Sequence, residues 1–208
     1  MLTIKPQPFN SLWVSAQSLQ ELGETFIRFQ EYYESPNPDF HGKPFTLGSV
    51  KSYYSIKYGG DTYSDMWVGF NFPSSILQPF FNGLFDPLTE HEQEFLRLVK
   101  YRTDSYYIIG AQSRSVLRHE LAHSMYSYCE DYRIEIDALI QKNKRKFGKV
   151  IQYMVGEGYS KKVVSDEIQA YVTDNDNHFI LDNLDPILIN SVNNIYQKHR
   201  RRCSNNEQ

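Results

Sequence analysis

Two histidines and a glutamate stand in one short segment, which reads His119, Glu120, Leu121, Ala122 and His123. On a helix, residues four apart lie one turn apart on the same face, so both imidazoles can reach one metal ion. Zinc binds imidazole nitrogens at about 2.0–2.1 Å, and histidines that share it should bring their nearest ring nitrogens within about 5 Å. Glu120 is placed to accept a proton from a water molecule that zinc activates. The spacing predicts a catalytic Zn²⁺ site with Glu120 as general base.

The surroundings favour a buried helix here over a surface helix that carries two incidental histidines. A β-favouring run over 106–110 ends at Gly110 and precedes the segment, and Leu121 and Ala122 are apolar. Further apolar positions extend the buried faces of the helix, namely Leu117, Met125 and Tyr128.

A catalytic zinc ion normally has a third protein ligand. The metzincin arrangement would place a glycine and a third histidine shortly after His123. It is absent, because the chain continues Ser-Met-Tyr-Ser-Tyr-Cys-Glu. The best candidate is Glu167, 44 positions after His123, because two intervening helices can return the chain to the motif. Alternatively, Asp166 and Glu167 are charges that suit the first turn of a helix. Weaker candidates are Glu157, Glu135 and, in a three-histidine site, His178.

Supporting residues are less constrained by spacing. Carboxylates commonly hold the second ring nitrogen of a ligand histidine, and the candidates are Asp166, Asp174 and Asp137. A donor to the developing oxyanion is also expected. The candidates are Tyr171, Tyr126, His178 and Arg133, with Tyr171 preferred because it shares a helix face with Glu167. Packing in the core explains a tyrosine equally well.

The elements that must position these residues read as an α+β fold, mostly helical, with a small sheet before the motif helix. Helices are expected at about 15–34, 46–58, 89–101, 113–128, 130–143, 146–156, 161–173 and 186–201. Thr89 and Glu92 form a capping box. A strand is expected at 106–110, and residues 66–73 read as a strand or an extended loop. We expect one domain over 1–208, with an N-terminal helical and extended part (1–104), a metal-site core (105–175) and a C-terminal helix and tail (176–208).

Composition narrows the classes of function. The net charge of −3 argues against nucleic acid as the main partner, and the basic run at 142–149 reads as a solvated face. Two cysteines, Cys129 and Cys203, support neither a disulfide framework nor a four-thiolate zinc site. There is no signal-peptide layout and no apolar run of about 18–20 residues. A cytoplasmic protein is expected, although export by a non-classical route would leave the same sequence.

The motif at 119–123, together with Asp-Glu-Ile-Gln-Ala-Tyr at 166–171, resembles zincin metallopeptidases of the gluzincin type over about residues 105–175. The resemblance implies a zincin-like core in which His119, His123 and Glu167 bind zinc. It also implies a peptide or protein substrate. The strand at 106–110 would then pair with the extended substrate through main-chain hydrogen bonds.

Two other classes remain open. One is a catalytically inactive zinc-binding scaffold, and the other is a metal-free helical interaction module. The intact Glu120 argues against the scaffold, because a structural zinc site needs no base and closes its fourth position with protein.

Overall fold

The computed structural model describes residues 1–60, 63–157, 159–175 and 177–205. They are mostly helical with one small sheet, which confirms the α+β expectation. The chain forms two compact units, Met1–Leu117 and Arg118–Gln208. Among the described residues, no helix is long and apolar enough to cross a membrane.

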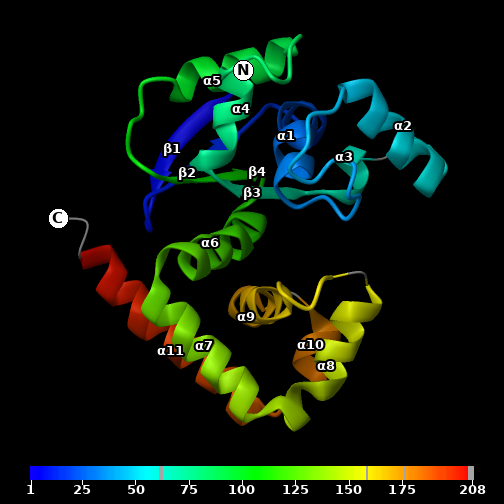
Figure 1. The fold of residues 1–208 in the computed structure, drawn as a ribbon. Helices are drawn as coiled ribbons and strands as arrows, with labels where there is room; N and C mark the ends of the chain where they lie inside the picture. The colour runs from blue at the N-terminus through cyan, green and yellow to red at the C-terminus, as the bar shows by residue number, and fades with distance from the viewer. Residues whose placement is uncertain (61–62, 158, 176, 206–208) are drawn as a thin grey trace. The chain divides into compact units, whose positions relative to one another are not determined.

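Four strands form a mixed sheet in the described part of the first unit, in the order β1-β2-β4-β3 (Figure 1). β1 (Thr3–Gln7) and β2 (Ser11–Ser15) are antiparallel, β2 is parallel to β4 (Tyr107–Ala111), and β3 (Gly69–Pro73) is antiparallel to β4. The expected strands at 66–73 and 106–110 are present, whereas β1 and β2 were not expected.

The position of β4 overturns one expectation. A strand can pair with a substrate only along a free hydrogen-bonding edge. Both edges of β4 are occupied, one by β2 and the other by β3. The strand at 106–110 is therefore the centre of the sheet and is closed to an extended peptide.

The described residues of the first unit form three long helices that were expected and several four-residue turns of helix that were not. They are α1 (Leu19–Glu34), α2 (Leu47–Tyr58), α3 (Tyr63–Met66), the 3₁₀ turn η1 (Ser74–Leu77), α4 (Gln78–Phe81) and α5 (Glu90–Val99). Thr89 and Glu92 form the expected capping box. The first helix was expected from Ser15 but begins at Leu19, because Ser18 caps its N-terminus and Ser15 itself is the last residue of β2.

Phenylalanine rings fill the core between α1 and the sheet. Phe26 lies with its ring centroid 5.0 Å from that of Phe95 and 5.4 Å from that of Phe72. A side chain at Gly110 would come within 2.8 Å of the Phe26 ring, so this strand position needs glycine. The same unit buries an ion pair, in which Arg28 donates to both carboxylate oxygens of Glu92 at 2.5 and 2.6 Å.

The second unit is built from helices that surround α9 (Val164–Asp174) (Figure 1). α7 (Glu130–Lys142), α8 (Lys144–Gly156), α10 (His178–Asp182) and α11 (Pro186–Asn205) all contact it. The motif helix, α6 (Arg114–Tyr128), precedes them. α10 was not expected, and α9 begins three residues later than predicted. Cys129 is buried and outside any disulfide, with its Sγ atom 3.9 Å from Nδ1 of His199, and the side chain of Cys203 lies outside the described residues.

Candidate metal centre

α6 directs its two histidines toward one point. The Nε2 atoms of His119 and His123 lie 3.1 Å apart, well within the separation expected of histidines that share a metal. His123 is buried and His119 is partly buried. The helical spacing of four residues therefore produces the convergence that the sequence predicted.

α9 brings Glu167 to the same point. Its Oε2 atom lies 3.8 Å from Nε2 of His123 and 4.0 Å from Nε2 of His119. Ala170, one turn further along the helix, is fully buried, so this face of α9 lies in the core. Of the carboxylates that the sequence offered as a third ligand, Glu167 is the one that the structure brings to both histidines.

Two aspartates on α9 hold the other ring nitrogens. Nδ1 of His119 lies 2.5 Å from Asp174 Oδ2, and Nδ1 of His123 lies 2.8 Å from Asp166 Oδ1. A carboxylate only accepts hydrogen bonds, so each Nδ1 carries a hydrogen, and Nε2 is the atom with the lone pair when the ring is neutral. Asp174 ends α9, where the helix dipole disfavours an acid, so its hydrogen bond to His119 accounts for its position.

The three converging atoms fit a zinc ion. A point equidistant from atoms with these separations lies about 2.1 Å from each of them. Zinc binds imidazole nitrogen at about 2.0–2.1 Å and carboxylate oxygen at about 2.0–2.2 Å. Two imidazoles and one glutamate also form a donor set found in catalytic zinc sites. Both the spacing and the chemistry of His119, His123 and Glu167 suit the metal.

The charges in the cluster alter two pKa values. Burial disfavours a charged imidazole, yet the carboxylates of Asp166, Glu167 and Glu120 raise the pKa of His123 well above its ordinary value. Burial raises the pKa of Glu167, although both histidines oppose the shift. The cluster by itself therefore retains protons, which a binding metal ion must displace.

Glu120 and two tyrosines complete the surroundings of the centre. Glu120 is buried, and its charge acts on His123, Glu167, Tyr159 and Tyr171. The ring of Tyr171 lies 4.6 Å from that of His119, and its hydroxyl is 3.1 Å from the Tyr159 hydroxyl. Burial is the largest cause that raises the pKa of both tyrosines, so both remain protonated donors at neutral pH.

The other candidates from the sequence lie outside this cluster. Asp137 accepts a hydrogen bond from Tyr126 instead of a ligand histidine. Arg133 donates to the main-chain oxygens of Tyr126 and Ser127. Glu135 pairs with Lys198 and His199, whereas Glu157 and His178 are exposed.

Sequence reasoning missed Tyr159 and Gln169. Tyr159 follows α8, and nothing in its local sequence separates it from the other 15 tyrosines of the chain. Gln169 did carry a usable signal, because it is a polar residue between the apolar Ile168 and Ala170, and all three are buried in α9. A buried amide in such a place must find hydrogen-bond partners.

A second group of possible ligands lies in the first unit, where Glu21, His91 and Glu94 bring one atom each within 4.8 Å of one another. The Met1 ammonium lies 2.6 Å from Glu21, and Glu94 accepts a hydrogen bond from the Leu2 main chain. Each of the three side chains thus already has a partner in the first unit, since His91 lies 3.4 Å from Glu24. In the α6–α9 centre, the three possible ligand atoms lie within 4.0 Å of one another.

Comparisons with protein-family models, with curated proteins and with solved structures found no match to this chain. The site must therefore be interpreted from its own geometry.

Proposed function

We propose that the protein is a zinc-dependent hydrolase that cleaves peptide bonds. The observation that carries the proposal is the convergence of His119 Nε2, His123 Nε2 and Glu167 Oε2 on a point about 2.1 Å from each. The resemblance of residues 119–123 and 166–171 to gluzincin-type peptidases supplies the choice of a peptide substrate.

Each residue of the centre has a role in this proposal. His119, His123 and Glu167 would hold the ion, and zinc bound there would polarise the scissile carbonyl and acidify a water molecule. Glu120 would accept a proton from the attacking water and deliver it to the nitrogen of the departing amine. As water adds to the carbonyl carbon and the C–N bond breaks, this transfer leaves a carboxylic acid and an amine.

The tyrosine pair would serve the oxygen of the carbonyl. One of the two hydroxyls donates to the other, so the second hydroxyl keeps a proton that it can donate to an oxygen gaining negative charge. Tyr171 is the preferred donor because its ring also packs against the ligand His119. Tyr159 would then orient it.

Metal analysis and one isosteric variant test the proposal. We expect one zinc per chain in the purified protein and cleavage of unfolded casein that stops on chelation and returns with zinc. Glu120→Gln should keep the zinc and lose about 100-fold or more of the activity, because a general base contributes about 10²–10⁴-fold. Glu157→Gln changes an exposed glutamate of the same unit and is the matched control.

The outcomes separate the classes of function. Protein that carries no zinc and acquires none would contradict the proposal and favour a metal-free interaction module. Stoichiometric zinc without cleavage of unfolded protein or of a peptide library would favour the inactive scaffold. Full activity in Glu120→Gln would remove the general base from the mechanism.

A further inference from the structure

A chain of hydrogen bonds leads from the candidate metal centre into α7. Asp166 Oδ1 accepts from Nδ1 of His123 at 2.8 Å and from Nε2 of Gln169 at 2.9 Å. Gln169 Oε1 in turn accepts from the hydroxyl of Tyr132 at 2.6 Å. Gln169 and Tyr132 are both fully buried, so water does not compete for the hydrogen bond between them.

The direction of each bond in this chain is fixed by chemistry. The carboxylate of Asp166 can only accept, so the NH₂ group of Gln169 must face it. The Tyr132 hydroxyl donates to the remaining amide oxygen and so stabilises that orientation of the amide. Asp166 therefore fixes the orientation of the amide, and Tyr132 stabilises Gln169 in that orientation.

Asp166 needs such support more than Asp174 does. The side chain of Asp166 is 25% exposed, whereas that of Asp174 is 5% exposed. A partly exposed carboxylate can exchange its partner for water, and the hydrogen bond from Gln169 opposes that exchange.

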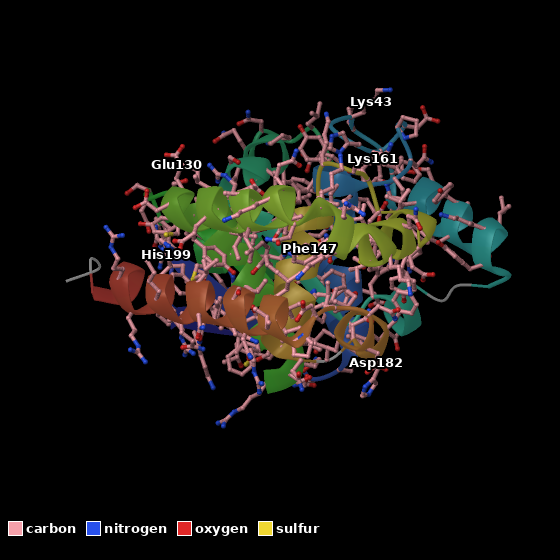
Figure 2. All side chains as sticks on the ribbon, turned by 90° about the horizontal axis from the view of Figure 1, so that it is seen from below. Lys43, Glu130, Phe147, Lys161, Asp182 and His199 are labelled. Carbon is pink, nitrogen blue, oxygen red and sulfur yellow. The ribbon has the colours of Figure 1, made fainter. Side chains whose placement is uncertain are left out.

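The C-terminal helix holds Tyr132 in turn. The rings of Tyr196 and His199 on α11 pack against Tyr132, with ring centroids at 6.1 and 5.8 Å. α7 and α11 lie side by side, and Figure 2 labels His199 on α11. The ring of Tyr132 is thus fixed by packing while its hydroxyl reaches toward α9.

We propose that Gln169 and Tyr132 are positioning residues of the zinc centre, which hold Asp166 and through it keep Nε2 of His123 directed at the metal. The inference rests on the proposed function, since it concerns the same metal site. It adds that the Tyr132 hydroxyl on α7, which contacts none of the proposed zinc ligands, contributes to the affinity for zinc.

Two nearly isosteric variants test this inference. Gln169→Met removes both hydrogen bonds of the side-chain amide, and Tyr132→Phe removes only the hydroxyl that donates to it. Zinc affinity is measured by competition with a chelator, and the ligand geometry by the absorption spectrum of the Co²⁺-substituted protein. Each variant should bind zinc about 2- to 10-fold more weakly and shift the Co²⁺ bands. Tyr196→Phe is the matched control, because it removes a hydroxyl from a neighbouring buried ring outside this chain of bonds.

Double-mutant cycles show whether the effect passes through Asp166. The loss in Tyr132→Phe should vanish in an Asp166→Asn background and persist in an Asp174→Asn background. Thermal unfolding of the metal-free proteins shows that each variant folds; if Gln169→Met does not, Tyr132→Phe carries the test. Unchanged zinc affinity and Co²⁺ spectrum in Tyr132→Phe, or an equal loss in both backgrounds, would overturn the inference. Wild-type protein that binds no zinc would instead overturn the proposed function.

Discussion

The two units bury charge in different ways. In the first unit Glu92 is matched by the guanidinium of Arg28, which also donates to the main-chain oxygens of Phe85 and Pro87. In the second unit Asp166 and Asp174 are paired with the imidazoles of His123 and His119, and Glu120 and Glu167 lie close by.

The difference separates a structural cluster from a chemical one. A guanidinium is always charged and offers its donors in a planar fork that matches a carboxylate. The Arg28–Glu92 pair therefore satisfies both groups without a metal ion. An imidazole that donates from Nδ1 keeps a lone pair on Nε2, and that lone pair can bind a metal ion. Changes in the first unit should therefore alter stability, whereas changes in the second should alter metal binding.

The largest effect is expected from breaking the buried pair of the first unit. Arg28→Met leaves the carboxylate of Glu92 buried without its cation, which should lower the free energy of unfolding by about 3–5 kcal/mol. Urea unfolding followed by tryptophan fluorescence measures the change. Arg102→Met is the control, because the Arg102–Asp104 pair is exposed and should contribute less than about 1 kcal/mol. Equal effects of the two changes would show that the buried pair adds nothing particular to the fold.

In the second unit the largest effect on zinc affinity should come from the proposed ligand Glu167. Glu167→Ala should weaken zinc binding by more than about 100-fold, because even outer partners of ligands contribute about 10- to 100-fold. Glu157→Ala, at an exposed glutamate beyond α8, should leave the affinity unchanged. Competition with a chelator measures both variants. Zinc stoichiometry and affinity that Glu167→Ala leaves intact would assign the third ligand elsewhere.

The parts of this structure that the sequence predicted depend on local signals. The capping box of Thr89 and Glu92 and the limits of α2 between Thr46 and Gly59 follow from a few adjacent residues. The pairing of His119 with His123 is also local, because a helix fixes the separation of residues four apart. Glu167 could be predicted because its spacing from the motif leaves room for two helices that return the chain to His119 and His123.

The parts that the sequence did not predict depend on distant partners. β2 pairs with β4, and Trp13 donates to the main-chain oxygen of Ala111, 98 residues away. Pairing of this kind leaves little trace in the five residues of the strand itself. The sequence likewise offered three aspartates as partners of the histidines. Only the packing of α9 shows that Asp166 and Asp174 are the ones that bind them.

The two aspartates that bind the histidines should contribute unequally to the affinity for zinc. Asp174→Asn should weaken zinc binding by about 10- to 100-fold, and Asp166→Asn should have the smaller effect because its side chain is more exposed to water. Asp137→Asn is the control, since Asp137 accepts from Tyr126 and holds neither histidine. Chelator competition on the three variants gives the ranking. An equal loss in Asp137→Asn would point to the general charge of the unit instead of to specific hydrogen bonds.

The smallest effect concerns Glu31 in the first unit, a carboxylate held by hydroxyl groups instead of by a cation. Burial raises its pKa above the ordinary 4.5, although Ser35, Tyr54 and Tyr63 donate hydrogen bonds to it. The folded state therefore binds the proton more tightly, and stability falls as the pH rises from 4.5 through the raised pKa.

Glu31→Gln removes this buried charge while its amide oxygen still accepts from Tyr54 and Tyr63 and its amide nitrogen faces the Ser35 hydroxyl. At pH 8 the variant should melt at or above the wild-type temperature, with a gain of less than about 2 kcal/mol. The difference between the two proteins should shrink toward pH 4.5, where the wild-type carboxyl is protonated. Thermal unfolding of both proteins across this range isolates Glu31 from all other titrating groups. A variant that is less stable at pH 8 would mean that the hydroxyls favour the charged form more than burial disfavours it, and hydroxyl groups would then suffice to stabilise a buried carboxylate.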